Sequence, residues 1–554
     1  MTLISKLPAD LEDVEALIKR RKNAEMKKDL WRSIYRDAYL YAMPARETFT
    51  WHTEGQYKNR RLFDSTLQEA TYTAANTLCA LLFPSWQNWA DLTPGGGISK
   101  DMLDSKPEIV AGLQAATKMF FAYLNASNFN TVISEAALDL QVGTAALSFD
   151  EGDNENPFIF QSIALSAIEI EEGPNGSIET TWMERHPLGR NLLRMYDGLE
   201  MLDLSAATRD KITKKPDEKL HILQGEVFHP KTKKYFGIVV DLEGGPNIIW
   251  RYDYGPSNPT IVMRASKCAG ETYGRGRVLL ALSDARTLDR MQEFVLTQAA
   301  LQVAPPMTGV SDGVLNPYTA SLTPNTIIPV ASNADNSPSL RPIELGGNFN
   351  ITEQMMKDLR ERVRRTMLGP EPSEGPVKSA TEISVADRNR LWAMNGEYNR
   401  IQGEGLAKIV ARGCFILQKK GLMPRFKIDG HTVTVKYTSP FATTQNADDV
   451  MNLEKTVQAI LGLGPQLGEQ VLSMGLKVKE LPAYVARLNG VPESLIMSDE
   501  DRKQAMKDAM QAQQMAQQNQ VQHQGAVAQA QNVPPPGQGQ PPGPPPPSAA
   551  PPPQ

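Results

Sequence analysis

The sequence is poor in cysteine and histidine, with three cysteines and six histidines among 554 residues. Cys79, Cys268 and Cys414 are far apart and odd in number, which argues against a disulfide framework and fits a reducing compartment. Neither a C-x-x-C nor an H-E-x-x-H pattern occurs, and a metal site needs clustered ligands. We therefore expect no metal and no cofactor, and interpret as solvated or core residues the scattered His52, His186, His221, His229, His431 and His523.

Long apolar runs and an excess of positive charge are also missing. No stretch approaches the roughly 20 apolar residues of a membrane span. The N-terminal MTLISKLPADLEDVEALIKRRK has early acids and no apolar core, unlike a secretory signal, so we expect synthesis in the cytosol and no membrane contact. The net charge is −5, whereas a protein that grips nucleic acid over its whole surface is basic. Any contact with nucleic acid is therefore expected to be local or weak.

A nucleotide-binding loop is missing as well, although residues 369–383, GPEPSEGPVKSATEI, come close to one. The phosphate-binding pattern is G-x-x-x-x-G-K-[ST], and Glu374 stands where its second glycine should follow Gly369. A phosphate cradle needs backbone N–H groups, which the three prolines of this loop lack, and Glu371 and Glu374 would repel phosphate. A helical pattern rather than a buried strand precedes the loop. The chemistry therefore disfavours a nucleotide.

The patterns that are present predict helices on both sides of a β-rich middle, an α+β fold. Helical patterns cover residues 9–42, 61–84, 107–125 and 130–147. Alternating apolar and polar residues with a turn at 174–176 predict an antiparallel sheet region over 155–265, with a short helix near 204–212.

The first predicted helix has a basic middle, IKRRKNAEMKK, over residues 18–28. Such a run is either a surface for an acidic partner or a solvated helix face. Because charge runs on helices are usually just exposed, the solvated face is the favoured interpretation.

Two later helices flank an irregular insert. Glycines and prolines forbid a long helix over 305–347, between helical patterns at 275–303 and 351–368. The apolar faces consist of Leu288, Met291, Val295 and Ala299 in the first helix and Met356, Leu359, Val363 and Met367 in the second. Another face of the second helix carries Lys357, Arg360 and Arg364.

Beyond the near-miss loop, a capping box at Ser379–Glu382 starts a helix predicted to run to about Gly421, with kinks near Gly403 and Gly405. A short strand pair is predicted over 425–438 and helices over 447–490. From about 511 the chain is rich in Gln, Ala and Met and then in Pro, so the tail 511–554 is expected to be extended or disordered.

Four segments carry a family resemblance: RLFDSTLQEATYTAANTLCALLFP followed by WADL, GETYGRGRVLLALSDARTLDRMQE, SATEISVADRNR and YTSPFATTQNAD. In this order they resemble the head-to-tail connectors, or portal proteins, of short-tailed bacteriophages. The resemblance covers about residues 20–500. Residues 441–444 depart from the leucine-alanine run that usually follows Ser-Pro in the family.

The resemblance implies the portal-protein fold, assembled as a dodecameric ring at one capsid vertex, through which DNA is packaged and ejected. It implies a set of parts within each chain. These are a wing over 1–274 (β-rich at 155–265), stem helices over 275–304 and 350–368, a clip over 305–349, a tunnel loop over 369–379, a long wing helix and β return over 380–445, a crown over 446–510 and the tail over 511–554.

The resemblance also implies which residues face DNA. The tunnel loop, punctuated by Gly369 and Gly375, would project toward DNA with Lys378 as its only cation. Glu371 and Glu374 would keep DNA from sticking, since each neutralised phosphate adds affinity. The second stem helix leaves two alternatives open. In the first, Lys357, Arg360 and Arg364 form a ring of positive charge around DNA. In the second, these cations form salt bridges to Asp358 or Glu361 of their own helix or to acids of the neighbouring subunit.

The implied partners are further copies of the chain, double-stranded DNA passing without sequence specificity, the large terminase subunit, a tail adaptor, and the major capsid and scaffolding proteins. The implied location is the virion, after assembly in the host cytoplasm, where the protein would nucleate capsid assembly. No catalytic constellation is found, so no enzyme activity is expected. Two alternatives stay open: a nucleotide-driven packaging motor subunit, and a tail or scaffold protein without a channel.

Overall fold

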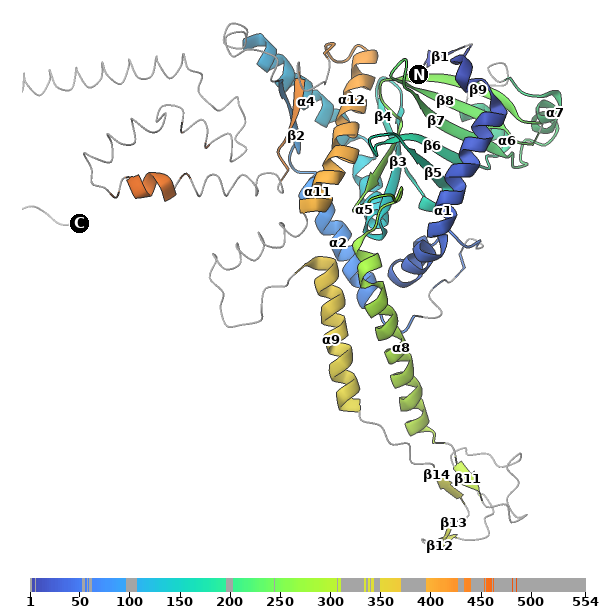
Figure 1. The fold of residues 1–554 in the computed structure, drawn as a ribbon, viewed down its shortest axis with the longest axis vertical. Coiled ribbons are helices and arrows are strands. Elements are labelled where there is room, and N and C mark those ends of the chain that lie inside the picture. The colour runs from blue at the N-terminus through green and yellow to red at the C-terminus, as the bar shows by residue number, and fades with distance from the viewer. Residues whose placement is uncertain are drawn as a thin grey trace, which may run out of the picture. The chain divides into compact units, whose positions relative to one another are not determined.

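The computed structural model confirms the mixture of helices and antiparallel strands (Figure 1). It describes residues 2–4, 6–51, 55–56, 58, 62–95, 107–195, 203–243, 245–305, 307–309, 349–369, 395–426 and 433–439, with short pieces within 333–342 and 453–485. The chain forms two compact units, Met1–Thr444 and Gln445–Gln554, and the elements below lie in the first. Nearly all of the predicted crown and the whole tail lie outside the described residues.

The N-terminal part is helical, as predicted. The elements are η1(Ala9–Leu11), α1(Val14–Ala42), η2(Pro44–Arg46), α2(Thr66–Leu82), α4(Pro107–Ala126) and α5(Phe129–Val142). The Asp13 carboxylate begins α1 by accepting hydrogen bonds from the N–H groups of Glu15 and Ala16 at 3.0 and 3.2 Å.

The helix predicted over 130–147 was too long, because α5 ends at Val142 and a strand follows directly. Gly143 makes this change of direction with φ +154°, and an added Cβ there would lie 2.2 Å from the carbonyl oxygen of Gly274. Only glycine allows the two backbones to approach so closely. The β-rich region therefore starts at Thr144 rather than at 155.

Two antiparallel sheets form the middle of the chain. The larger has the order β1-β9-β8-β7-β6-β5 and the smaller β10-β3-β4. Their strands are β1(Thr2–Leu3), β3(Thr144–Glu151), β4(Phe158–Ile163), β5(Ile168–Glu172), β6(Ile178–Arg185), β7(Ile222–His229), β8(Lys234–Asp241), β9(Asn247–Gly255) and β10(Thr260–Arg264). The predicted short helix is α7(Ala206–Lys214), and the unpredicted η3(Leu165–Ala167) and α6(Gly189–Met195) accompany it.

The strand pair predicted over 425–438 has a different partner. Strand β15(Val433–Tyr437) pairs antiparallel with β2(Ala90–Pro94), with Val435 opposite Leu92. This pairing joins segments more than 300 residues apart, so a local pattern could not reveal it.

The basic run of α1 is a solvated face only in part: Lys19, Lys22 and Lys27 are exposed, whereas three other cations pair with acids of the large sheet. Arg20 lies 2.7 Å from Glu171, and Arg21 lies 2.5 Å from Glu184. Lys28 lies 3.0 Å from Glu169 and donates to the carbonyl oxygen of Ser166. The charges therefore fix how α1 lies across the sheet (Figure 1).

Of these pairs, Lys28–Glu169 is the most deeply buried, with side chains 3% and 6% exposed. Burial lowers the pKa of Lys28 and raises the pKa of Glu169, although each partner's charge acts in the opposite sense. Both shifts disfavour the charged forms. The mutual attraction therefore offsets only part of the desolvation cost, and losing one partner leaves a costly buried charge.

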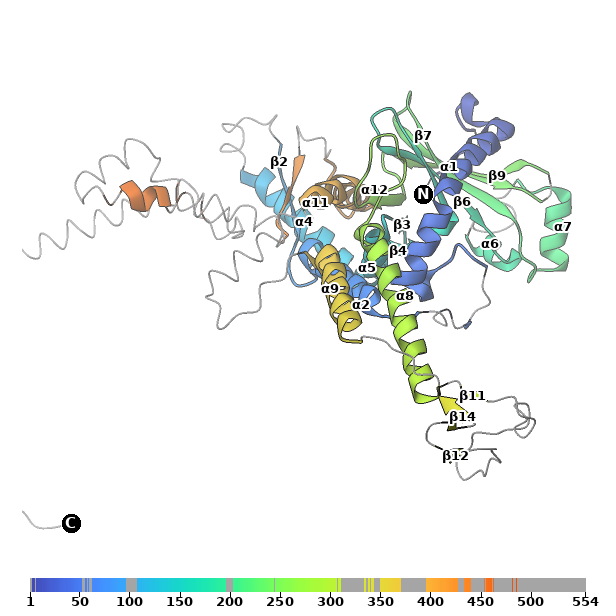
Figure 2. The ribbon, with the colours of Figure 1, turned by 60° about the horizontal axis from the view of Figure 1, so that its bottom comes forward.

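The two helices predicted over 275–303 and 351–368 are present as α8(Arg277–Val303) and α9(Phe349–Leu368), which lie side by side (Figures 1 and 2). Leu288 of α8 packs with Met356 and Leu359 of α9, joined by the half-buried Met291 and Val295. Val363 and Met367 continue the seam into the body's core. The predicted apolar face of α9 is confirmed, and that of α8 is confirmed at Leu288, Met291 and Val295.

Between α8 and α9 the structure describes only short strands: β11(Met307–Gly309) pairs with β14(Leu340–Pro342), and β12(Asn333–Ala334) with β13(Ser337–Pro338). The later helix consists of α11(Asn395–Ile401), the π-helical turn η5(Gln402–Leu406) and α12(Ala407–Lys419). The irregular turn contains Gly403 and Gly405, where kinks were predicted.

Arg264, fully buried at the end of β10, explains why η5 lies where it does. Its Nε and Nη2 donate to the Glu404 carboxylate of η5 at 3.1 and 2.6 Å, and its backbone N–H donates to the same group at 3.0 Å. The guanidinium also donates to Glu172 and to the carbonyl oxygens of Gly176 and Thr272. One side chain thus joins both sheets and the late helix.

We predict that Lys28→Met lowers the free energy of unfolding by about 3–5 kcal/mol, because Glu169 is left buried without its main partner. The double variant Lys28→Met/Glu169→Leu is expected to recover most of the loss, since an apolar pair needs no charge balance. Urea denaturation of the purified variants measures both effects. Lys27→Met, at an exposed neighbouring position, is the control and should change the free energy of unfolding little. Equal losses of stability in Lys28→Met and Lys27→Met would contradict the assignment of Lys28–Glu169 as a buried ion pair.

Candidate nucleic-acid-facing surface on the paired helices

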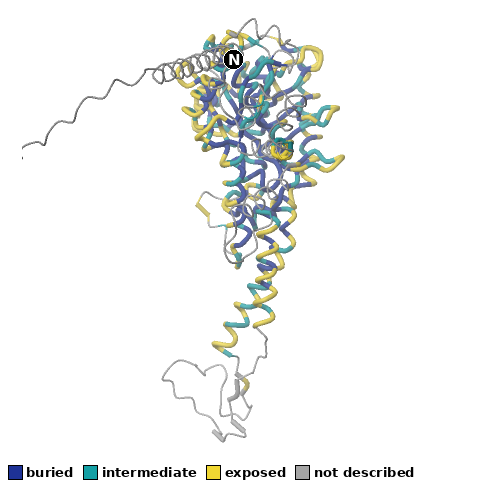
Figure 3. Tube along the Cα trace, turned by 90° about the vertical axis from the view of Figure 1, so that its left-hand side faces the viewer, coloured by how far each residue is buried: buried dark blue, intermediate teal, exposed yellow. Residues whose placement is uncertain are grey.

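The pair α8 and α9 leaves the body as an exposed arm. In α8, which the structure describes throughout, no residue beyond Asp289 is buried. Figure 3 shows exposed residues along most of the pair's outer length. Since only the seam between the two helices is covered in the part of α8 beyond Asp289, most side chains of this outer part are available to a partner.

The three cations predicted to face DNA differ in their surroundings. The Arg360 guanidinium donates to Asp64 Oδ2 at 3.0 and 2.9 Å and to Gln292 Oε1 at 3.2 Å. Lys357 and Arg364 are exposed and form no ion pair with another described residue, nor do Arg362 and Arg365 on other sides of α9. The bridging to Asp358 or Glu361 that the sequence left open is not seen among these residues, and Arg360 uses Asp64 instead.

A second set of contacts holds the base of the arm. The Asp289 carboxylate accepts hydrogen bonds from the backbone N–H groups of Phe63 and Asp64 at 2.7 and 3.1 Å. Asp64 Oδ1 accepts from the Thr66 N–H at 2.9 Å and thereby caps α2, while its Oδ2 faces Arg360. Two aspartates thus tie the start of α2 to both helices of the arm.

Arg277, at the start of α8, ties the arm to the late helix. Its Nη1 donates to the Met367 carbonyl oxygen at 2.9 Å, near the end of α9, and its Nε lies 3.1 Å from the Glu397 carboxylate of α11. These two contacts stand on either side of the chain segment 369–394. Arg277 is therefore an anchor for both ends of the segment that contains the predicted tunnel loop.

Gly369 ends α9 in the left-handed region, with φ +84°, and its N–H donates to the Arg365 carbonyl oxygen at 2.9 Å. This is the usual role of a glycine just past a helix end. The other predicted loop residues, Glu371, Glu374, Gly375 and Lys378, lie outside the described residues, as do the capping box and most of the clip.

Sequence reasoning missed Arg277, Asp289 and the contact of Asp64 with Arg360, because the partners are distant in sequence. It also found the histidines scattered, whereas the fold brings His186 and His221 together with Glu184. All three cysteines are free, as expected without a disulfide framework. Among the helices that the structure describes, none has the length and apolar character to cross a bilayer.

Comparison with known proteins gives one family and two related phage proteins. Residues 14–497 match the family described as bacteriophage head to tail connecting protein. The portal protein of Escherichia phage T7 is 21% identical over 491 residues, which cover 83% of this chain and 83% of the phage protein. The portal protein of Enterobacteria phage T3 is 21% identical over 455 residues, 79% of this chain and 80% of that protein.

We predict that Arg277→Met speeds tryptic cleavage after Lys378 severalfold, because the segment 369–394 loses the contact that both its ends share. The variant also leaves Glu397 half-buried without its cation, so thermal stability should fall. Peptide mass analysis over a digestion time course measures the cleavage. Arg290→Met, an exposed α8 arginine paired with Glu293 one turn away, is the matched control. Equal cleavage rates in the two variants would refute the anchor.

Proposed function

The chain belongs to the bacteriophage head to tail connecting protein family, and from this premise we propose that it is a portal protein. It forms a dodecameric ring at one vertex of the capsid, through which double-stranded DNA enters during packaging and leaves at infection. It acts as a structural part of the virion rather than as an enzyme. The observation that carries the proposal is the exposed arm of α8 and α9, in the part of the chain where the family resemblance places the channel stem.

The large apolar side chains that the arm exposes support assembly into a ring. They lie on both helices: Phe294, Leu296, Leu301 and Val303 of α8 and Ile351 and Met355 of α9. A neighbouring copy in a ring would cover such side chains, and their burial from water would favour the contact. A hollow of about 330 Å³ between α1 and α8, lined by Ile34, Leu279 and Arg286 among others, offers a further docking surface.

Weak electrostatic contact with DNA fits passage through such a ring. Each phosphate that a protein neutralises adds affinity by releasing counterions, and a ring repeats each contact in every subunit. A conduit that held DNA by many cations would stop it. On α9 only Lys357 and Arg364 remain from the predicted cationic face once Arg360 is paired with Asp64. We propose that these two residues, with the loop 369–379, line the channel.

The remaining parts follow the family arrangement. The segment 305–349 is the clip, where the large terminase subunit docks during packaging and a tail adaptor afterwards. Residues 1–274 and 380–445 form the wing, 446–510 the crown and 511–554 a tail. Contacts of the wing with the major capsid and scaffolding proteins would let the ring nucleate capsid assembly. The energy of translocation comes from the motor that docks at the clip.

We predict that electron microscopy of the purified protein, viewed down the particle axis, shows closed rings near twelvefold with a hole wider than duplex DNA. Phe294→Asp/Ile351→Asp is expected to yield monomers or small oligomers of unchanged melting temperature, because both residues are exposed in the single chain. Ile159→Asp, an exposed apolar residue of β4, is the control and should still form rings. Small compact oligomers of the wild type at every salt concentration, or measurable ATP turnover, would reject the portal proposal.

The channel assignment predicts a weaker salt dependence of DNA retention in Lys357→Gln/Arg364→Gln rings. The slope of log affinity against log salt should become shallower by about 0.9 for each phosphate contact that is lost. Arg362→Gln/Arg365→Gln removes the same charge from the other sides of α9 and should leave the slope unchanged. Fluorescence anisotropy with a labelled duplex gives the slope, and a change only in the second variant would show that the other side of α9 faces DNA.

A further inference from the structure

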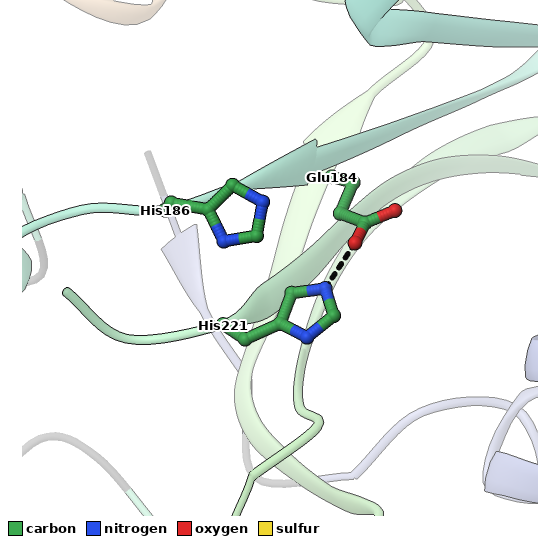
Figure 4. Close-up of side chains that lie close together, drawn as sticks. All are labelled: Glu184, His186 and His221. Carbon is green, nitrogen blue, oxygen red and sulfur yellow. Dashed lines mark hydrogen bonds and ion pairs between the residues drawn. The ribbon is translucent and has the colours of Figure 1, made fainter. Parts of the chain in front are cut away.

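A cluster of two imidazoles and one carboxylate lies on the large sheet, away from the arm. Glu184 is in β6, His186 follows the end of β6, and His221 precedes β7. One possible ligand atom from each residue lies within 4.8 Å of the other two. Figure 4 shows the two rings one above the other, with the Glu184 carboxylate beside them and directed at His221.

Strand register explains why these residues meet. Glu184 pairs with Leu223 and Arg185 with Ile222 in the β6–β7 ladder. The ladder continues beyond the two strands, since the Leu220 N–H donates to the Pro187 carbonyl oxygen at 2.8 Å and Leu188 bridges to Lys219. His186 and His221 are therefore directly opposite each other. Glu184, two residues before His186, points to the same face of the sheet.

Glu184 and His221 are held in place before any ligand arrives. Glu184 Oε2 accepts from Arg21 of α1 at 2.5 Å, while its Oε1 contacts His221 Nε2. The rings of His186 and His221 have centroids 4.8 Å apart and an angle of 30° between their planes. Arg21 also lies 2.9 Å from Glu25 and 3.9 Å from Glu169, so its charge is shared among three carboxylates. A partner that orients a ligating carboxylate is typical of metal sites.

We propose that Glu184, His186 and His221 bind a divalent transition-metal ion of the zinc type. Two imidazoles and one carboxylate suit Zn²⁺ and its neighbours, whereas Mg²⁺ and Ca²⁺ prefer oxygen ligands alone. Tetrahedral bonds of about 2.0–2.1 Å put ligand atoms roughly 3.3 Å apart, which small side-chain rotations reach from the present positions. His186 is exposed, so an ion has access and a water completes the fourth position.

The ion would act as a cross-link within the wing. Its ligands come from β6 and from the residue before β7, and Arg21 connects Glu184 to α1. Binding to the folded chain alone stabilises it by mass action. This proposal does not depend on the channel or on ring formation.

The test uses the full-length protein, treated with EDTA and desalted, and titrated with ZnCl₂ by calorimetry. One ion is expected per chain, with a rise in melting temperature, and Co²⁺ should give the visible absorption of a tetrahedral site. His186→Ala, at an exposed position that should not disturb folding, is expected to weaken zinc binding at least tenfold and to abolish the temperature shift, as is Glu184→Gln.

Glu218→Gln is the matched control, because it removes the same charge from an exposed acid close to His221 in sequence but outside the cluster. It should bind zinc like the wild type, and MgCl₂ should produce no shift in any variant. A wild-type protein that binds no zinc would overturn the proposal. So would stoichiometric binding that His186→Ala and Glu184→Gln leave unchanged, since the ion would then occupy another place.

Discussion

The position of one buried guanidinium, that of Arg277, constrains the parts of the chain proposed to handle DNA. The guanidinium donates hydrogen bonds to the Met367 carbonyl oxygen and to the Glu397 carboxylate, which lie 90 and 120 residues further along the sequence. A buried cation that loses its partners costs several kcal/mol, so the start of α8, the end of α9 and the start of α11 move together or not at all. The segment 369–394 is consequently held at both ends by one side chain, while Asp289 and Asp64 hold the same base from the side of α2.

Several arginines and one lysine that could have bound DNA instead join parts of the chain to one another. Arg20, Arg21 and Lys28 position α1 on the sheet, and Arg264 joins the sheets to η5. The fully buried Arg412 of α12 donates to the carbonyl oxygens of Phe149 and Ser257, which connects the late helix to the smaller sheet. Such contacts fix the relative positions of elements that are distant in sequence, within a protein of net charge −5. A cation that holds the fold together in this way is not free to neutralise a phosphate.

The sequence predicted features whose cause is local. The apolar seam of α9 followed from a helical period, and the irregular turn at 402–406 from two glycines within a helix. It could not predict what depends on the meeting of distant segments: the pairing of β15 with β2, the ion pairs of α1, or the opposition of His186 and His221. At Gly143 the local pattern favoured more helix, but the backbone of Gly274 approaches too closely for any other residue and the chain turns into a strand. Of the candidate channel residues, the sequence identified the shared face of Lys357, Arg360 and Arg364 but not the aspartate that binds one of them.

Helix α9 presents three different faces: one packed on α8, one apolar and exposed, and one cationic. Successive residues turn by about 100°, so Met355 and Arg364, nine residues apart, point in opposite directions, while the seam of Leu359 and Val363 lies between them. One side of α9 therefore packs on α8, one exposes apolar side chains, and one carries Lys357 and Arg364, which form no ion pair with another described residue. Contact between copies would be stabilised by burial of apolar area, whereas contact with DNA would be stabilised by charge. Salt screens the contact between charges but not the apolar contact. In the ring that we propose, these two interactions occupy separate faces of the same helix, so salt that weakens contact with DNA leaves the apolar contact between subunits in place.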